Sequence, residues 1–260
     1  GENQRDKGKR LWIKPAVLCF WLLIWELVCR VVGNEIFLVS PLTVAKALLT
    51  LIGQGKFLMT IAYSFFRIVL GFLLATLTGT LLATLAYRFE LLKELVHPLI
   101  AVVKAAPVAS FVILALLWVD GSSLSILISF LMVVPIIYTN VYQGLIATDR
   151  KLLEMAQVFK IKRRKTIRAI YIPSVMPYFI SAVTVGLGFC WKAGISAEVI
   201  GIPSGSIGER LYEAKIYLIT DELFAWTAVI IVISILFEKA VLYLIQIAGL
   251  NTYDSSRDNP

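Results

Sequence analysis

Long apolar blocks with few charges dominate this chain, and they restrict the solvent in which it can fold. Each block is close to the roughly 20 apolar residues that a helix needs to cross a lipid bilayer. A transmembrane barrel would instead show alternating segments of about 10 residues. The sequence therefore predicts an all-α membrane protein with about six transmembrane helices. The six blocks are residues 15–33, 60–87, 98–119, 124–145, 177–201 and 223–249.

The amino-acid composition fits a protein whose solvent is lipid. Hydrophobic residues make up 59% of the 260 residues and charged residues 16%, whereas soluble domains average about 45–50% and about 25%. Cys19, Cys29 and Cys190 all lie inside apolar blocks without paired spacing. We expect them to be free thiols that pack as small hydrophobic groups.

The first apolar block follows a basic stretch, as the core of a signal peptide does. It contains Glu26 and Arg30, runs longer than an ordinary signal-peptide core, and lacks a small-x-small cleavage site. We interpret it as a retained membrane helix that follows a polar tail, residues 1–14. Glu26 and Arg30 stand four residues apart on one helix face, so we expect them to form an ion pair.

The distribution of basic residues indicates how the helices are oriented. With the N-terminus in the cytoplasm, and with Lys239 in the inner half of the last block counted on the inner side, the inner side holds 17 of the 25 Lys and Arg residues, the outer segments four, and the rest of the spans four. The positive-inside rule therefore predicts a cytoplasmic N-terminal tail, 1–14, and a cytoplasmic C-terminal tail, 250–260. The net charge of +8 then reflects topology, and we expect no nucleic-acid binding.

Residues 34–59 link the first two apolar blocks and are expected outside the membrane on the external side. Within them, Ser40 and Pro41 form a typical helix start, with Ser at the cap and Pro at the first helical position. The spacing of apolar residues then predicts a short amphipathic helix over 42–52 that lies on the outer surface.

Prolines and small residues indicate how the spans bend and pack. Pro107 should kink or open the third span, and Pro135 should break the fourth. The fifth span has small residues at four-residue spacing, which is more typical of a helix-packing seam than of a substrate surface. These residues are Ala182, Gly186, Cys190 and Gly194.

The segment 147–173 is too polar to span a membrane and too regularly patterned for a slack linker. Its apolar residues recur at helical spacing and precede the basic run 162–165. This pattern predicts an amphipathic helix pair with a basic turn on the cytoplasmic face. An interfacial helix bound to anionic headgroups is the alternative interpretation. The apolar residues are Leu152, Leu153, Ala156, Phe159 and Ile161.

The same segment carries a spaced motif, E-x-A at its start and I-x-I-P at its end. The residues that carry it are Glu154, Ala156, Ile170 and Pro173. In this spacing the segment resembles the EAA coupling loop of importer permeases in the ATP-binding-cassette superfamily. Lys160 replaces the glycine of that loop, which implies ordinary helical geometry or a different bend in place of the tight turn that glycine permits.

Further motifs, over roughly residues 40–244, narrow the resemblance. In order along the chain they are Ser64-x-x-Arg67-x-x-x-Gly71-Phe72, Leu117-Trp118, Gly188-x-x-Trp191, Ala197-Glu198-x-x-Gly201, and Ser206-Ile207-Gly208 with Leu211-Tyr212. In this order and spacing the chain is similar to the nitrate/sulfonate/taurine (NitT/TauT) group of permeases.

The resemblance implies a fold and an assembly. The fold is the MetI-like bundle of type I importers, with residues 60–249 as the permease core and 147–173 as the coupling loop. The implied partners are a second permease copy, two cytoplasmic ATPase subunits, an outer substrate-binding protein and the lipid bilayer. The implied location is the bacterial cytoplasmic membrane. The ATPase subunits would bind ATP and Mg, and we expect no cofactor or metal in this chain.

The resemblance also implies where the ATPase binds and what is transported. The contact patch is expected to contain Glu154, Ala156, Phe159 and Lys160, with Pro173 behind it. The substrate is expected to be a small anion such as a sulfonate, taurine or nitrate. The alternative is a vitamin precursor or another small heterocycle that the same machinery imports.

Charged residues inside the spans need an escape to water or a partner, because each costs about 2.5–3.5 kcal/mol on the insertion scale. Arg67 and Lys104 lie close enough to span ends to snorkel toward the interface. Lys192 lies roughly 22 Å beyond Pro177 along its helix, at about 1.5 Å per residue, which is too deep for escape.

Lys192 therefore needs a partner or a function. Glu198 stands six positions further on, about 240° around the helix, so the two side chains cannot pair within it. We hypothesise that Lys192 faces the pathway or a carboxylate across an interface, where it could attract an anionic substrate. An ordinary interhelical ion pair is the alternative. Trp191 and Glu198 are the other candidate pathway residues.

Two other classes of function compete with a permease. An enzyme would need clustered catalytic groups, but His97 is the single histidine, and the sequence has no G-x-S-x-G, H-E-x-x-H or Walker A motif. The membrane subunit of energy-coupling-factor importers would show short Ala-Arg motifs, and none occurs. We therefore expect a non-catalytic subunit of an ATP-hydrolysing transport complex.

Overall fold

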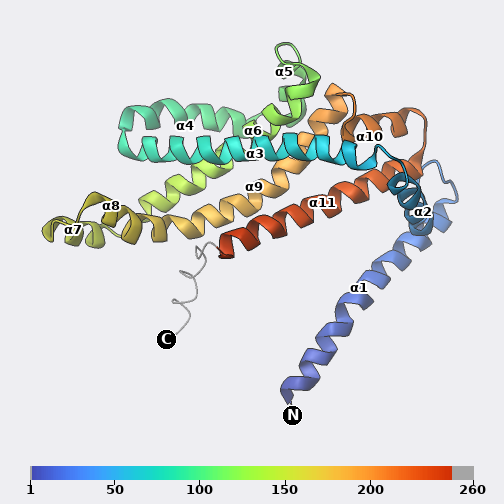
Figure 1. The fold of residues 1–260 in the computed structure, drawn as a ribbon, viewed down its shortest axis with the longest axis horizontal. Coiled ribbons are helices and arrows are strands. Elements are labelled where there is room, and N and C mark those ends of the chain that lie inside the picture. The colour runs from blue at the N-terminus through green and yellow to red at the C-terminus, as the bar shows by residue number, and fades with distance from the viewer. Residues whose placement is uncertain (1, 248–260) are drawn as a thin grey trace. The chain divides into compact units, whose positions relative to one another are not determined.

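A computed structural model describes residues 2–247 of this chain, with side chains from residue 15 onward (Figure 1). Helices and short connections make up this range, which contains no strand. The helices are α1 Glu2–Val32, α2 Pro41–Ile52, α3 Phe57–Arg88, α4 Glu90–Ala105, α5 Val108–Ala115, α6 Gly121–Ile146, α7 Arg150–Val158, α8 Arg163–Thr166, the π-helical turn η1 Ile167–Tyr171, α9 Ile172–Gly201, α10 Ile207–Ile216 and α11 Thr220–Ile247.

Contacts divide the chain into two units. The first takes in the chain up to Met59 together with Arg210–Val229, and the second takes in Thr60–Glu209 together with the residues from Ile230 onward. Helix α1 begins at Glu2 and so includes residues predicted as a polar tail. The predicted C-terminal tail, 250–260, lies outside the described residues.

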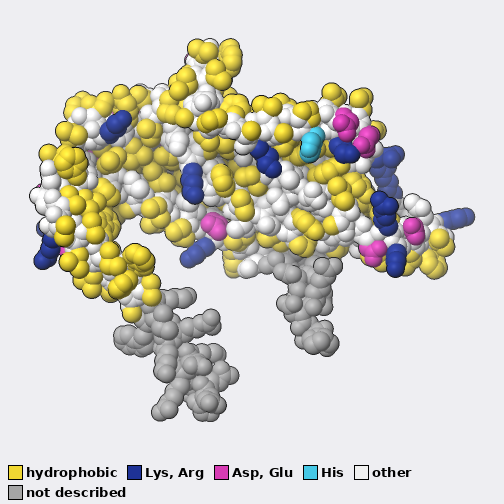
Figure 2. Space-filling view, turned by 180° about the vertical axis from the view of Figure 1, so that it is seen from behind, with side chains coloured by type: hydrophobic (Ala, Val, Ile, Leu, Met, Phe, Trp, Pro, Cys, Tyr) yellow, Lys and Arg dark blue, Asp and Glu magenta, His cyan; other side chains and the backbone are white. Residues whose placement is uncertain are grey.

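Five helical segments of the described range are long and apolar enough to cross a membrane, and a sixth span results if α4 and α5 count as one bent pair. The segments are α1 from Pro15, α3, α6, the continuous stretch Arg163–Gly201 and α11. An all-α membrane fold is therefore confirmed. Figure 2 shows that hydrophobic side chains cover much of the visible face, as lipid contact requires.

Pro107 bends the third span, as predicted, and the bend is sharp. Helices α4 and α5 meet at 104°. Ala106 is extended (φ −78°, ψ 139°), and Pro107 stands at the cap position of α5. Because proline disfavours helical geometry in the residue before it and supplies no N–H itself, α4 ends here and α5 begins anew.

Pro135 does not break the fourth span, so that prediction is wrong. Helix α6 runs without interruption from Gly121 to Ile146, and Pro135 is buried inside it. Its neighbours in the helix contact α3, where a side chain added at Gly79 would collide with Ile137 and the Val134 carbonyl. Packing around the buried proline lets the helix continue despite the missing hydrogen bond.

Helix α6 packs against α9 along most of their lengths, and this pair forms the core of the second unit (Figure 1). Glycines make the close approach possible. A Cβ at Gly194 would lie 2.6 Å from both the Ile68 side chain and the Ser129 hydroxyl, and one at Gly186 would meet Val133 at 3.2 Å. The small residues of the fifth span therefore form a packing seam, as predicted.

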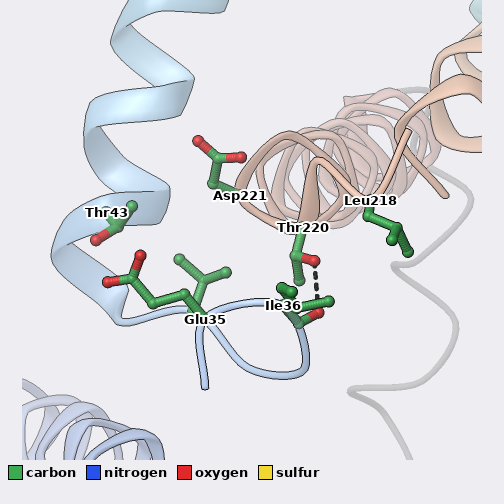
Figure 3. A pocket seen from close by; sticks show the side chains of 7 residues that line it. Glu35, Ile36, Thr43, Leu218, Thr220 and Asp221 are labelled. Carbon is green, nitrogen blue, oxygen red and sulfur yellow. Dashed lines mark hydrogen bonds between the residues drawn. The ribbon is translucent and has the colours of Figure 1, made fainter. Parts of the chain in front are cut away.

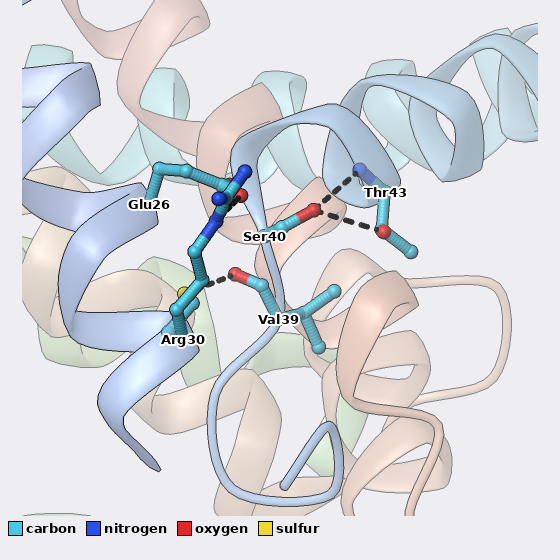
Figure 4. A network of polar contacts seen from close by, with 6 residues as sticks. Glu26, Arg30, Val39, Ser40 and Thr43 are labelled. Atoms are coloured by element: carbon cyan, nitrogen blue, oxygen red, sulfur yellow. Dashed lines mark hydrogen bonds and ion pairs between the residues drawn. The ribbon is translucent and has the colours of Figure 1, made fainter. Parts of the chain in front are cut away.

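Local contacts in the first unit confirm two further predictions. The Ser40 hydroxyl accepts a hydrogen bond from the Thr43 N–H at 3.3 Å and so caps α2. Arg30 and Glu26 form an ion pair at 3.0 Å on α1 (Figure 4). The Cys29 thiol donates to the Val39 carbonyl at 3.2 Å, and it is buried and free, whereas Cys19 is free but exposed.

A small pocket lies between the α1–α2 connection and the start of α11, within the first unit (Figure 3). The Thr220 hydroxyl donates to the Ile36 carbonyl at 2.7 Å beside it. Two carboxylates, those of Glu35 and Asp221, are its acidic groups. The lining residues are Glu35, Ile36, Val39, Thr43, Leu218, Thr220 and Asp221.

Candidate functional site

The predicted coupling segment forms an elbow at one end of the α6–α9 pair. We define the elbow as α7, the turn 159–162 and α8. Asp149 starts it, because its carboxylate accepts a hydrogen bond from the Lys151 N–H at 2.8 Å and caps α7. The elbow then continues through η1 into α9 without leaving helical geometry. The elbow therefore connects the two long spans α6 and α9 along the chain.

Lys160 ends α7 in a left-handed conformation, with φ +49°. Its N–H donates to the Gln157 carbonyl at 3.0 Å, and the Ile161 N–H donates to the Ala156 carbonyl at 2.9 Å. These two bonds define a Schellman motif, the usual place for a glycine. The expectation that lysine imposes ordinary helical geometry is wrong, because the paired end bonds hold the turn that glycine would otherwise favour.

The elbow presents apolar side chains to solvent. Val158 is 77% exposed, Phe159 is 73% exposed and Met155 is 44% exposed. Ala156, on the opposite side of α7, is 3% exposed and packs inward. Exposed large apolar groups that cluster at one place commonly mark a protein contact. We call Met155, Val158 and Phe159 the elbow patch.

Charges flank the elbow patch. Glu154 and Lys160 are exposed beside it, and the run 162–165 is exposed directly after it. Within the described side chains, none of these charged groups forms an ion pair. The elbow therefore combines an apolar centre with a basic rim and one carboxylate, all free to meet another molecule.

Pro173 lies apart from the elbow patch, half-buried near the start of α9. It follows the π-helical turn η1, where the Ile172 N–H donates to the Ile167 carbonyl, five residues back. A proline cannot donate to the carbonyl four residues before it and collides with that carbonyl in a regular helix. The wider π turn removes this collision, so Pro173 shapes the link between elbow and span.

The three candidate pathway residues of α9 do not share one surface. Trp191 is 2% exposed and packs edge-on against Phe237, with ring centroids 6.3 Å apart. Glu198 is fully buried. Lys192 alone is exposed, with its ammonium 5.9 Å from the centre of the Phe189 ring. Lys192 is thus the one of the three whose side chain is exposed in this arrangement, and the pathway role of all three stays a prediction.

Glu198 belongs to a buried polar cluster with α3 and the start of α10. Its Oε2 accepts hydrogen bonds from the Ser64 hydroxyl at 2.7 Å and from the Gly208 N–H at 3.3 Å. The Ser64 hydroxyl in turn accepts from the Ile207 N–H at 2.9 Å. The sequence motifs contain all of these residues, but 134 positions separate Ser64 from Glu198, and no local pattern links them.

Arg67 lies beside this cluster on α3. Its side chain was expected to extend freely toward the membrane interface, and it does not do so. Its guanidinium carbon lies 4.1 Å above the centre of the Tyr63 ring, and its Nη1 atom is buried without a hydrogen-bond partner. Stacking on the tyrosine face replaces part of the hydration that the charge loses. Lys104, by contrast, is exposed.

Comparison with known proteins decides the family. Residues 67–247 match the family model described as binding-protein-dependent transport system inner membrane component. This chain belongs to that family. The match takes in the elbow, the α6–α9 pair and α10, so the elements described above are those of a MetI-like permease of ATP-binding-cassette transporters.

Relatives of this permease carry the names of several substrates. A Bacillus subtilis permease named for aliphatic sulfonates is 27% identical over 90% of this chain and 85% of its own length. The nitrate import permease of Synechococcus elongatus is 27% identical over 77% and 76%. The formylaminopyrimidine transport permease of Halalkalibacterium halodurans is 24% identical over 74% and 78%. The permease therefore falls in the nitrate/sulfonate/taurine group.

Proposed function

We propose that this chain is the membrane permease of an ATP-driven importer and that its elbow binds a cytoplasmic ATPase subunit. The observation that carries the proposal is the exposed elbow patch at the end of the paired spans α6 and α9, in a chain of this transport family. An ATPase groove would cover Val158 and Phe159. Full burial of one such side chain contributes about 1.5–3 kcal/mol.

The charges around the patch support a protein partner. Glu154 is placed to accept hydrogen bonds from backbone amides or a basic side chain of the ATPase. The basic run 162–165 would meet acidic groups at the rim of the groove. An interfacial helix that bound only lipid headgroups would also use the basic run. Its apolar side chains, however, would be buried in the bilayer to which those headgroups belong.

The link between elbow and spans supports a coupling mechanism. ATP binding closes the ATPase pair and displaces the elbow, and the α9 helix, continuous with η1, moves with it. ATP and a loaded binding protein then favour the outward-open conformation, because each contacts that conformation more strongly. Transport follows from the alternation between the two conformations.

The proposal includes an assembly in the bacterial cytoplasmic membrane. Two permease copies would form the pathway, two ATPase subunits would bind the two elbows, and a substrate-binding protein would dock on the outer face. The positive-inside bias supports an elbow and chain termini on the cytoplasmic side. The ATPase subunits would bind ATP and Mg and carry out hydrolysis.

A small anion is the substrate class that we propose first. The names of the sulfonate and nitrate relatives support it. The exposed Lys192, deep in the apolar part of α9, supplies a positive charge that would attract an anion. A small heterocycle is the second candidate, which the name of the formylaminopyrimidine relative supports.

Site-specific crosslinking tests the coupling proposal directly. In a background without the three native cysteines, Phe159→Cys should crosslink to the co-expressed ATPase subunit in intact membranes. Ser123→Cys, at the other end of α6, serves as the control and should not. An elbow cysteine that is modified only from outside the cell, or that never reaches the ATPase, would overturn the proposal.

Uptake into proteoliposomes tests the substrate class. The purified complex with its binding protein should import a labelled sulfonate or nitrate only when ATP is present on the side of the membrane that carries the ATPase subunits. A labelled aminopyrimidine in parallel vesicles distinguishes the second candidate. Uptake that proceeds equally without ATP would contradict an ATP-driven importer.

A further inference from the structure

Several polar contacts hold the turn between α9 and α10. Ser206 caps α10, because its hydroxyl accepts from the Glu209 N–H at 3.0 Å. The Glu209 carboxylate accepts a hydrogen bond from the Gly205 N–H at 2.6 Å, one residue before the cap. These local bonds already satisfy part of the helix start. The next two N–H groups of α10, those of Ile207 and Gly208, are bound from outside the turn.

Those two N–H groups bind side chains of two different spans. Ile207 donates to Ser64 on α3, and Gly208 donates to Glu198 on α9. Ser64 and Glu198 also bind each other at 2.7 Å. We call this four-group arrangement the α10 latch. Since Glu198 is fully buried, its carboxylate has been taken out of water to hold a helix start, where the helix dipole favours a negative charge.

The backbone around the latch is packed too tightly to shift without breaking it. A Cβ at Gly208 would collide with the Cβ and backbone of Glu198. A Cβ at Gly121 would lie 2.5 Å from the Gly201 carbonyl oxygen. Ile202, between α9 and α10, has φ +46°, a conformation that β-branched residues rarely adopt. The chain reversal is therefore strained, and the latch is what holds it.

The surroundings offer the latch other partners. Glu198 Oε1 and Ser125 Oγ are buried without a hydrogen-bond partner, and so is Arg67 Nη1. Two of these atoms can donate, and the third, on the carboxylate, can accept. If α10 moves away, Glu198 loses the Gly208 donor and can accept from Ser125 or Arg67 in its place, without exposing its charge. Such an exchange gives the cluster two alternative arrangements.

One helix connects the latch with the elbow. Pro173 and Glu198 both lie on α9, which has 30 residues and so a length of about 45 Å at about 1.5 Å per residue. Rigid elements with two discrete arrangements are the physical means by which distant sites influence each other. A displacement of the elbow that moves α9 along its axis or turns it reaches Glu198 directly.

We propose that the α10 latch opens and closes as the permease switches conformation, with Glu198 as the positioning residue that holds α10 to α3 in one of the two states. This inference rests on the proposed transport function, because it assumes that α9 moves with the elbow. The latch then determines when the α9–α10 turn is released. It contacts no substrate in this role.

A reversible disulfide tests the latch. Ser64→Cys combined with Ile207→Cys, in a background without the native cysteines, should form a bond that stops ATP-driven uptake by the reconstituted complex. Reduction with dithiothreitol should restore uptake to the level of the same variant before oxidation. If the oxidised, crosslinked complex transports like its parent, α10 and α3 never separate and the proposal is overturned.

Substitutions of the carboxylate provide the second measurement. Glu198→Ala should raise basal ATP hydrolysis severalfold and weaken its stimulation by the loaded binding protein, while Glu198→Gln, which keeps an acceptor oxygen, should retain most of the stimulation. Ser196→Ala is the matched control, because Ser196 is exposed two residues away and its hydroxyl bonds only to the Lys192 carbonyl. Equal stimulation in Glu198→Ala and the parent would contradict a latch.

The outcomes separate this inference from the proposed function. If the parent complex shows no ATP-driven uptake, the proposed function fails, whatever the variants do. If the parent transports and the crosslink has no effect, the latch alone fails. If Glu198→Ala does not assemble, the disulfide result decides, because that variant keeps the carboxylate.

Discussion

The turns that precede and follow the continuous helical stretch Arg163–Gly201 carry the same backbone feature in opposite surroundings. At the elbow, Lys160 is left-handed, exposed and next to apolar side chains that no part of the described chain covers. At the other end, Ile202 is left-handed beside a buried cluster of polar groups. The elbow therefore suits an encounter with another molecule, whereas the latch suits an internal contact that is either made or broken.

This contrast predicts different sensitivities to substitution. At the elbow, the chemistry of exposed side chains should matter and backbone substitutions should matter little. At the latch, space should matter most, because nothing can be added without a collision. Four substitutions test this difference, from the largest expected effect to the smallest.

The largest effect is expected for Phe159→Asp. A carboxylate in an apolar groove loses its hydration without a partner, so ATP-driven uptake should fall by at least about tenfold. Phe37→Ala and Phe37→Asp are the controls, because Phe37 lies outside the spans and is 74% exposed, similar to Phe159 at 73%. Uptake and the amount of complex that co-purifies with the ATPase are the measurements. Normal uptake by Phe159→Asp would remove the elbow patch as a contact.

The next effect is expected for Gly208→Ala. The added methyl group collides with Glu198, so the complex should lose about 1–3 kcal/mol of stability. Gly188→Ala is the matched control on α9, since a Cβ there meets nothing within 4 Å. Thermal unfolding of the purified complex measures both. A Gly208→Ala complex as stable as the parent would show that the latch is looser than the structure indicates.

A smaller effect is expected for Lys192→Ala, a substitution on α9 between the elbow and the latch. Loss of the positive charge should raise the KM for an anionic substrate severalfold and leave kcat nearly unchanged. Lys104→Ala, an exposed lysine on α4, is the control. The KM for a neutral heterocycle should not change. An unaltered KM for the anion would rule out an attractive role for Lys192.

The smallest effect is expected for Lys160→Gly. Glycine adopts the left-handed conformation at no steric cost, but it loses more freedom on folding, so stability should change by less than about 1 kcal/mol. Uptake should remain near the parent level. Lys160→Ala keeps the strained backbone and removes the charge. If Lys160→Gly and Lys160→Ala both impair uptake equally, the lysine side chain itself contacts the partner.

Features that depend on solvent or on near neighbours could be predicted from the sequence. The apolar blocks predict the spans, because a backbone in lipid must satisfy its own hydrogen bonds, and solid apolar blocks do so as helices and not as barrel strands. The Ser40 cap, the Glu26–Arg30 pair and the Pro107 bend each depend on residues a few positions apart. The position of the elbow also followed from its own pattern of residues.

Features that depend on distant contacts could not be predicted. Pro135 leaves α6 intact because neighbouring helices hold it, and Lys160 is left-handed because two end bonds of α7 outweigh its strain. Glu198 was expected at a pathway, but tertiary packing buries it against Ser64, 134 positions away. Sequence patterns locate charges along a helix, but packing decides which of its faces is covered.

The glycine seams between α3, α6 and α9 limit where polar cargo can travel. Gly71, Gly79 and Gly194 bring these helices so close that a single added methyl group has no room, and one at Gly186 would lie 3.2 Å from the Val133 side chain. At these contacts the three helices leave no space for a polar solute between them. If two copies form the pathway, as proposed above, the substrate would pass along an outer flank of these helices, and each copy would supply one wall of its route.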